Sequence, residues 1–374
     1  MENITNSRVG QVFHRVAQMS KKKPIKAFIT NPLAYICLRE LRDFLESPDI
    51  HVYVITWNTR IQNQIKELAK MDNGISVSNV TPSFKTPALA KMLYLPIILT
   101  ARIRLWIAMA SLHADDRIVV AQLSSPYIKY VIRLSKKRKK KIIAVDDGLS
   151  TLVQYGILSD IGYLDTESQQ KASMSFLSRL ENLIFSNHVI YADDISYFSF
   201  FPLEAFGPAL LRRNTFPSIR EMKKFQKSEN FVYFIGQPHT RAGRTSKEDY
   251  KKLIMDVAKF YRNRNLRMVY FPHPKEDTSQ FEGVIEIRRP VVPFEMYLIN
   301  QEEIPVVVSS IFSTSIFICQ SIFGNQMKYE LIWTEPVLRS LLKPNHSLLS
   351  SLMFLTKGSN DFTIVSSFEK EGVS

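Results

Sequence analysis

The sequence is poor in cysteine, and charged residues interrupt its apolar stretches. Only two cysteines occur among the 374 residues, Cys37 and Cys319, and both lie in apolar helical patterns typical of a buried, unreactive thiol. This scarcity fits a reducing compartment. Lysine and arginine interrupt the most apolar stretch, Ala88 to Leu112, so it predicts a long buried or interfacial helix and not a membrane-spanning one. The N-terminal residues lack the apolar core of a signal peptide, so we expect an intracellular protein.

Other patterns are also missing, and each absence argues against a class of protein. No internal repeat is present, which argues against a solenoid or a propeller. No GxGxxG or Walker A sequence occurs, so dinucleotide and ATP binding lose their main support. The 7 histidines and 2 cysteines never fall at metal-ligand spacing, so we expect no metal site.

Positive charge exceeds negative charge, with 49 Lys and Arg against 35 Asp and Glu and a formal net charge of +14. This balance implies an anionic partner, such as nucleic acid, a phospholipid surface or a phosphate-rich substrate. Two clusters concentrate the charge, Lys21 to Lys23 and Lys136 to Lys141. The second cluster either complements the negative end of a helix dipole or docks on anionic lipid. Nucleic acid is disfavoured because no aromatic residues are interleaved with these runs.

The periodicity predicts an α/β protein with two domains. At 374 residues and 45% hydrophobic content, the chain can form two cores. Short β-branched or aromatic runs alternate with helical patterns from Ile25 to Asp147 and again from Phe231, with a polar linker over 212–230. We expect two Rossmann-like domains facing each other across a cleft, which is the GT-B arrangement. The predicted domains are residues 1–225, including the linker, and 226–374, including a C-terminal helix.

The elements behind this prediction follow one another along the chain. Strands are predicted over 25–30, 50–56, 75–80, 117–123, 141–147, 231–236, 267–273 and 304–310. Helices are predicted over 33–45, 61–71, 88–112, a segment ending at 134, 247–263, 293–300, 314–323 and 335–355.

Two polar segments that follow predicted strands carry titratable groups. In Asp146-Asp147-Gly148, adjacent carboxylates repel each other and a glycine permits a sharp turn. The pair either forms an ordinary Asp-Gly turn or supplies a general base whose neighbour holds the geometry. After the strand ending at His273, two prolines fix the backbone around the imidazole. This histidine is either structural or binds a phosphate as its imidazolium.

Two further segments carry amides and hydroxyls. The hydroxyls between Ser309 and Ser315 can cap the following helix, and the exposed amides of the same helix start can bind phosphate. Both interpretations can hold together. Gly236-Gln237-Pro238 ends the first strand of the second half and is a weak signal by itself.

Together these segments resemble, in order along most of the chain, the bacterial sialyltransferases of glycosyltransferase family 52, the lipooligosaccharide sialyltransferase group. A looser similarity exists to bacterial polysialyltransferases. The segments that carry the resemblance are ITNPLAYICL (29–38), AVDDGLSTL (144–152), FIGQP (234–238), YFPHPKE (270–276) and VSSIFSTSIF (308–317).

The resemblance implies an inverting, metal-independent transfer from a CMP-activated sugar, with no cofactor. Asp146, or alternatively Asp147, would be the base, and His273 would meet the CMP phosphate. Asn31 and Gly148 would serve the acceptor side or the structure. The implied donor-binding residues are Gly236, Gln237, Pro274, Lys275, Glu295, Ser309, Ser310, Ser313 and Thr314.

The leading prediction is therefore a sialyltransferase that moves sialic acid, or a related nonulosonic acid, onto a lipid-linked lipooligosaccharide or capsular glycan. We expect it to be peripheral on the cytoplasmic face of a bacterial inner membrane, bound to the anionic surface and not to nucleic acid. One alternative uses CMP-pseudaminic acid, CMP-legionaminic acid or CMP-Kdo. An alternative of another class is a non-catalytic basic protein of polysaccharide assembly or nucleic-acid binding. The acceptor, the linkage and a homodimer stay open.

Overall fold

The chain forms two compact units, Met1–Asn214 (unit 1) and Thr215–Ser374 (unit 2). This computed structural model describes residues 23–82, 94–113, 115–164, 176–185, 188–201, 203, 209–221, 226–240, 245–274, 276–342, 352–353, 355–356 and 361–368. The division lies before the boundary predicted at residue 225, because α10 (Pro217–Arg220) packs within unit 2. There the Nε of Arg220 donates to the carbonyl oxygen of Ser321 at 2.9 Å.

Unit 1 contains a seven-stranded sheet whose order is β3-β2-β1-β4-β5-β8-β9. All neighbouring strands in it are parallel, and Ile25 of β1 pairs with Ile50 of β2 and with Arg117 of β4. The strands are β1 (Ile25–Ile29), β2 (Ile50–Val54), β3 (Ile75–Asn79), β4 (Arg117–Val120), β5 (Ile142–Val145), β8 (Ile195–Ser199) and β9 (Ala209–Arg213). A separate antiparallel pair joins β6 (Tyr163–Leu164) to β7 (Ile190–Tyr191).

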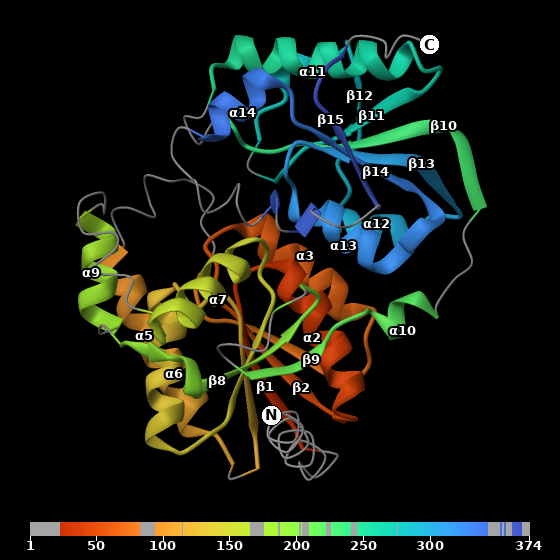
Figure 1. Cartoon of the computed structure of the whole chain (residues 1–374). Coiled ribbons are helices and arrows are strands. Elements are labelled where there is room, and N and C mark those ends of the chain that lie inside the picture. Colours follow the sequence, from red (N-terminus) through yellow and green to blue (C-terminus); the bar gives the residue numbers. More distant parts are fainter. Residues whose placement is uncertain are drawn as a thin grey trace, which may run out of the picture. The chain divides into compact units, whose positions relative to one another are not determined.

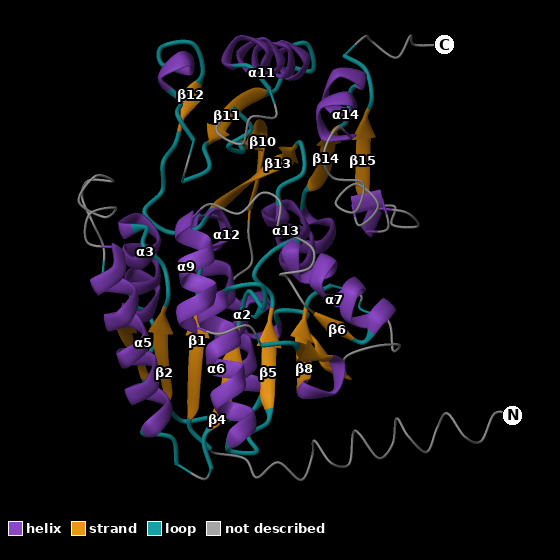
Figure 2. Ribbon diagram, turned by 90° about the vertical axis from the view of Figure 1, so that its left-hand side faces the viewer, coloured by secondary structure: helices purple, strands orange, loops and turns teal. Residues whose placement is uncertain are grey.

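Helices cover both faces of the unit 1 sheet. Figure 1 shows α2 and α3 on one side of the sheet and α5 and α6 on the other, and Figure 2 shows α5, α6 and α9 side by side. Every residue of β4 and β5 is consequently buried, as expected for strands covered on both faces. The helices are α2 (Pro32–Phe44), α3 (Thr59–Lys70), α5 (Tyr94–Ala110), α6 (Pro126–Lys137), α7 (Ser150–Ile161) and α9 (Phe176–Phe185).

Unit 2 contains a second parallel sheet, of six strands in the order β12-β11-β10-β13-β14-β15. Figure 1 shows α11 on one face of this sheet and α12 and α13 on the other. The strands are β10 (Gln226–Ile235), β11 (Arg267–Phe271), β12 (Glu286–Ile287), β13 (Glu303–Ser310), β14 (Lys328–Ile332) and β15 (Phe362–Val365). The helices besides α10 are α11 (Lys247–Arg262), α12 (Phe294–Ile299), α13 (Thr314–Phe323) and α14 (Glu335–Leu342).

Both sheets have the strand order of a Rossmann-like domain, which confirms the predicted pair of α/β domains. The structure also contains elements that were not predicted from the sequence. These are the strands β8, β9, β14 and β15 and the helices α7 and α9. The predicted linker over 212–230 contains α10 and the start of β10. The predicted helix over 335–355 includes α14, and residues 343–351 lie outside the described residues, as do Lys21 and Lys22. In the described ranges, no helix is both long enough and apolar enough to cross a membrane.

Candidate functional site

The sequence-predicted site residues lie mainly in loops that follow parallel strands. In unit 1 the strand order reverses between β1 and β4, and in unit 2 it reverses between β10 and β13. Ligands of open α/β sheets bind outside the carboxyl ends of the strands at such reversal points. The candidate residues follow β1 and β5 in unit 1 and β10, β11 and β13 in unit 2. Each unit therefore presents one sheet edge with the geometry of a ligand site.

Asp146, predicted as the base, is part of the interior of unit 1. Its side chain is 0% exposed. The hydroxyl of Ser199 donates to its Oδ1 and the backbone N–H of Phe200 donates to its Oδ2, both at 2.7 Å. Burial raises the pKa of Asp146 to about 7, against the lowering effect of these two hydrogen bonds. Because both oxygens are engaged away from solvent, Asp146 fastens the end of β5 to the end of β8, and its role as the base stays a prediction.

Asp147, the next residue, is partly exposed, although its carboxyl group is closely surrounded by protein. The hydroxyls of Ser150 and Thr151, in the first turn of α7, donate to its Oδ1 at 2.5 and 3.0 Å. Burial raises the pKa of Asp147, and these two hydrogen bonds oppose the rise. The structure thus brings an oriented carboxylate to the carboxyl edge of the sheet at Asp147.

Asn31 and Gly148 hold the turn that carries Asp147. The side chain of Asn31 caps α2 by accepting from the N–H of Ala34 at 2.9 Å. Its amide nitrogen also donates to the carbonyl oxygen of Asp147 at 3.0 Å, which ties the end of β1 to the end of β5. Gly148 has φ +123°, a conformation that favours glycine. Both residues therefore have structural roles directly beside the carboxylate.

The loop after β11 is closed by a reciprocal pair of hydrogen bonds. The N–H of His273 donates to the Oε2 of Glu276 at 3.0 Å, and the N–H of Glu276 donates to the carbonyl oxygen of His273 at 2.9 Å. His273 and Pro274 are partly exposed, whereas Glu276 is 7% exposed. Burial raises the pKa of Glu276 to about 7, and the hydrogen bond from Tyr270 is the largest effect that opposes the rise. Lys275 lies outside the described residues.

Gly236, at the end of β10, makes room for the group that supports this loop. A methyl group at Gly236 would lie 2.3 Å from the hydroxyl of Tyr270 and 2.5 Å from the Oε2 of Glu276. Only glycine fits such a close approach. The hydroxyls of Tyr250 and Tyr270 are 2.9 Å apart, and Tyr270 donates to Glu276, so buried polar groups extend from α11 to the loop. The predicted donor-binding role of Gly236 is accompanied here by a clear structural role.

Gln237 follows Gly236 and has a polar atom without a partner. Its N–H donates to the hydroxyl of Tyr250 at 3.3 Å. Its side-chain Oε1 is inaccessible to solvent and has no hydrogen-bond partner in the described part of the chain. A buried acceptor without a donor is unfavourable, so this oxygen is suited to accept from a bound molecule.

The serine-rich turn after β13 separates into interior and accessible hydroxyls. Ser309 and Ser310 are both 0% exposed. Ser310 donates to the carbonyl oxygen of Ile235 at 3.1 Å and accepts from the N–H of Ser313 at 3.0 Å. Ser309 lies beside the hydroxyl of Tyr261 in the interior. Ser310 is thus engaged within the protein, whereas the Oγ of Ser309 is inaccessible to solvent and has no hydrogen-bond partner among the described residues. The donor contacts of Ser309 and Ser310 stay predictions.

Ser313 and Thr314 remain at the start of α13. Ser313 is the N-cap, and its hydroxyl accepts from the N–H of Ser315 at 3.3 Å. Thr314 is partly exposed. Glu295, in the first turn of α12, is 4% exposed and interacts with the side chain of Ser315, and burial raises its pKa. The start of α13 thus combines helix amides, the capping hydroxyl of the 9% exposed Ser313, the partly exposed Thr314 and a buried carboxyl group.

Two residues at the unit 1 reversal point were missed by the sequence analysis. Gln122, directly after β4, has φ +59°, which is uncommon for a residue other than glycine. The Oγ1 of Thr30, directly after β1, is inaccessible to solvent and has no hydrogen-bond partner among the described residues. Glutamine carries no turn signal in sequence and threonine is common at strand ends, so neither position stood out.

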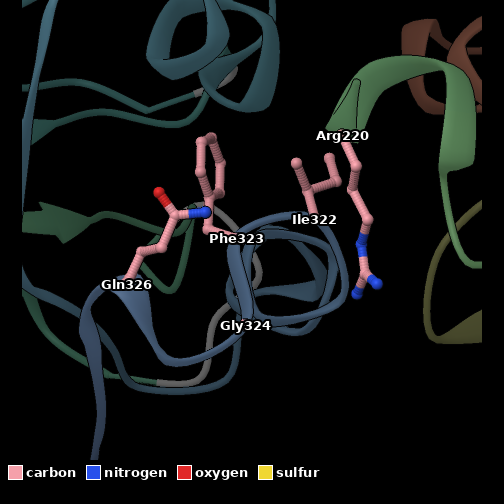
Figure 3. A pocket seen from close by; sticks show the side chains of 5 residues that line it. All are labelled: Arg220, Ile322, Phe323, Gly324 and Gln326. Carbon is pink, nitrogen blue, oxygen red and sulfur yellow. The ribbon is translucent and has the colours of Figure 1, made fainter. Parts of the chain in front are cut away.

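A small pocket lies elsewhere in unit 2. It has a volume of about 210 Å³ and is lined at the C-terminal end of α13 and at α10, as Figure 3 shows; the lining residues are Arg220, Ile322, Phe323, Gly324 and Gln326. The 10-residue α13 is about 15 Å long, which separates this pocket from the serine-rich turn at the other end. Within the ranges the structure covers, no three His, Cys, Asp or Glu side chains group as metal ligands.

Comparison with known proteins defines the class. Residues 112–330 match the alpha-2,8-polysialyltransferase (POLYST) family. Because the match spans more than half of the 374 residues, the chain belongs to this family and is a glycosyltransferase of the sialyltransferase type. The prediction of a bacterial sialyltransferase-like GT-B protein is confirmed at this level. Family 52 membership remains a prediction.

Solved structures that match over most of the chain include two enzymes described with UDP or UDP-sugars. One is a UDP-glucosyltransferase from Polygonum tinctorium, capable of glucosylating indoxyl and solved with 3,4-dichloroaniline, with 11% identity, a TM-score of 0.46, and coverage of 94% of this chain and 87% of that chain. Another is the UDP-GlcNAc 2-epimerase of Methanocaldococcus jannaschii with UDP-GlcNAc and UDP, with 14% identity, a TM-score of 0.43, and coverage of 82% and 83%. No curated protein matches the sequence.

Proposed function

We propose that the protein transfers sialic acid, or a related nonulosonic acid, from a CMP-activated donor to a glycan hydroxyl, with inversion and without a metal or cofactor. The observation that carries this proposal is Asp147, a partly exposed residue whose carboxylate is oriented by two hydroxyls in a member of the polysialyltransferase family. The acceptor is proposed to be a lipid-linked lipooligosaccharide or capsular glycan at the inner face of a bacterial inner membrane.

The chemistry assigned to Asp147 is general base catalysis. Its carboxylate takes the proton of the acceptor hydroxyl while that oxygen attacks the anomeric carbon of the donor sugar. The bond from this carbon to the phosphate oxygen breaks, and its electron pair leaves with CMP. Burial raises the pKa of Asp147 above its ordinary value, which makes its carboxylate a better proton acceptor.

Binding of the CMP phosphate is assigned to unit 2. His273 lies on a loop fixed by Glu276, and as an imidazolium it would stabilise the negative charge of the leaving phosphate. Ser313, Thr314 and the amides at the start of α13 supply further donors for a phosphate. The unpaired Oε1 of Gln237 would accept a hydrogen bond from the donor.

The experiment that tests the proposal is CMP release from CMP-N-acetylneuraminic acid in EDTA. Two acceptors are compared, one ending in galactose and one ending in sialic acid, because the family description names an alpha-2,8 linkage. Asp147→Asn is expected to lose about 10² to 10⁴-fold in rate while it keeps its melting temperature. His273→Ala is expected to lose about 10² to 10³-fold. Asp160→Asn, which changes an exposed carboxylate of α7, is the matched control and should keep full activity.

The variant Asp146→Asn distinguishes the role of Asp146 from that of Asp147. Below its melting temperature this variant should keep most of the wild-type rate, because the side chain of Asp146 is 0% exposed and both its oxygens are hydrogen-bonded within unit 1. Loss of activity in folded Asp146→Asn, with retention in Asp147→Asn, would contradict the assignment of the base. If CMP-N-acetylneuraminic acid gives no release, the same assay with CMP-pseudaminic acid, CMP-legionaminic acid and CMP-Kdo decides the donor, and inactivity with all four refutes the transfer reaction.

A further inference from the structure

One side of α5 exposes a continuous apolar stripe. Five large apolar side chains on this helix are between 43% and 59% exposed: Leu95, Leu99, Ile103, Trp106 and Ile107. Their spacing of three to four residues places them on one face of the helix. The opposite face is buried in unit 1, so α5 is apolar on both sides. We call these five residues the α5 stripe.

Such a stripe is unusual on a protein surface. Single exposed apolar residues are ordinary, but a contiguous group marks contact with another protein or with a membrane. The tryptophan is informative because its ring suits the boundary between the headgroups and the acyl chains of a bilayer.

A basic cluster adjoins the C-terminal end of this helix. Arg138 donates to the carbonyl oxygen of Met109, and Lys140 donates to that of His113, so the end of α6 lies against the end of α5 (Figure 2). Lys136 and Lys137 lie in the last turn of α6. Part of the basic cluster therefore complements the negative end of this helix dipole, which is one of the two interpretations given to the cluster above.

The charge of this cluster is not neutralised by its acidic neighbours. Asp194 pairs with Lys136 at 2.8 Å, and Asp115 pairs with Lys23 at 2.7 Å. Three further lysines of the cluster are exposed and form no ion pair with a described residue: Lys137, Lys139 and Lys141. A net positive charge therefore remains beside the α5 stripe.

We propose that the α5 stripe and the basic end of α6 form a docking surface for an anionic lipid bilayer. The helix would lie in the plane of the interface, with its apolar face at the acyl boundary and the lysines at the phosphate groups of the lipid. An apolar helix face combined with basic residues is the arrangement that binds peripheral proteins to anionic membranes.

A second copy of the chain is a poorer occupant of this surface. Each copy carries a net charge of +14, so association through a face flanked by free lysines would bring like charges together. The docking surface also does not depend on the proposed transfer reaction, because none of its residues belongs to the candidate site.

The test is binding of the full chain to vesicles of phosphatidylcholine, with and without phosphatidylglycerol, measured by co-sedimentation. We expect binding to the anionic vesicles that weakens as salt is raised. Of the three tryptophans, Trp106 is 57% exposed, Trp57 is partly exposed and lies outside the α5 stripe, and Trp333 is 5% exposed, so a blue shift of fluorescence on binding should come mainly from Trp106. The shift should disappear in Trp106→Phe while binding persists.

Variants separate the apolar and the basic contributions. Ile103→Asp should weaken vesicle binding about tenfold or more, whereas Met71→Asp, at a residue that is 57% exposed beside α3, should not change it. Replacement of Lys137, Lys139 and Lys141 by glutamine should weaken binding to anionic vesicles by about tenfold or more. CMP release without lipid should be the same in all these variants.

Three outcomes would overturn the proposal. The first is no binding of the wild type to either kind of vesicle. The second is binding that Ile103→Asp leaves unchanged. The third is a wild type that sediments as a dimer without vesicles and an Ile103→Asp variant that sediments as a monomer, which would make the stripe an interface between copies. CMP release is measured in a separate assay. None of these three results would therefore contradict the proposed transfer reaction.

Discussion

Replacing Asp146 by asparagine should change how the stability of unit 1 depends on pH. The buried carboxyl group has a pKa raised to about 7, whereas an aspartate in an unfolded chain has a pKa of about 3.9. The folded protein therefore holds this proton more tightly than the unfolded chain does. The stabilisation from this group is complete below about pH 4 and is lost as the pH rises through about 7.

The size of this effect follows from the difference between the two pKa values. About three pKa units correspond to roughly 4 kcal/mol of the free energy of unfolding, lost between about pH 4 and pH 7. Asparagine cannot ionise, so the variant lacks this loss. It also lacks one acceptor for the donors Ser199 and Phe200, which costs about 1–3 kcal/mol at every pH. Asp146→Asn should thus be the less stable protein at pH 4.5 and should approach or exceed the wild type at pH 8.

Urea unfolding at intervals of half a pH unit, followed by far-UV circular dichroism and tryptophan fluorescence, measures this difference. Trp57 and Trp106 both lie in unit 1, so fluorescence reports mainly on that unit. The charge of Asp147 helps to raise the pKa of Asp146, so its effect on Asp146 is part of the measured difference. Parallel pH profiles for the two proteins would refute the assignment of a buried, ionisable Asp146. Asp160→Asn is the control whose profile should parallel the wild type.

Further predictions concern unit 2. Gly236→Ala should lower the free energy of unfolding by about 1–3 kcal/mol, because the added methyl group meets Tyr270 and Glu276, and an unchanged urea midpoint would contradict it. Glu276→Gln should cost about 1 kcal/mol and weaken CMP binding in calorimetry, because the carboxylate holds the loop of His273; unaltered affinity would exclude that positioning role. Ser313→Ala should lose about 1 kcal/mol by thermal unfolding through the missing cap, whereas Ser313→Asn should lose little; equal melting temperatures would refute the cap.

The order of apolar runs in the sequence predicted most of the central strands, and hence the edges where site residues gather. β5 ends at Val145, and a carboxylate pair directly after it had to lie at the carboxyl edge of a parallel sheet. Which carboxylate faces the interior was not predictable. The partner of Asp146 is the N–H of Phe200, 54 residues further along the chain, and no local pattern indicates this contact.

Some elements were missed because tertiary contacts override their composition. β14 contains Glu330, a charged residue within a strand of five residues. In the structure Glu330 is 2% exposed, and the guanidinium of Arg264 binds both its oxygens at 2.8 and 2.9 Å. Arg264 lies 66 residues earlier in the sequence. A buried carboxylate paired with a distant arginine is specified by two positions together, so neither position indicates a strand by itself.

The two neighbours of β1 in the finished sheet emerge at different times during biosynthesis. Ile25 pairs with Ile50 on one side and with Arg117 on the other. At a synthesis rate of about 5–20 residues per second, the second neighbour leaves the ribosome on the order of 5–20 s after β1. During that interval one edge of β1 has no partner strand, and open strand edges promote aggregation. The nascent chain, more than the finished enzyme, is therefore the state in which we expect chaperones to matter.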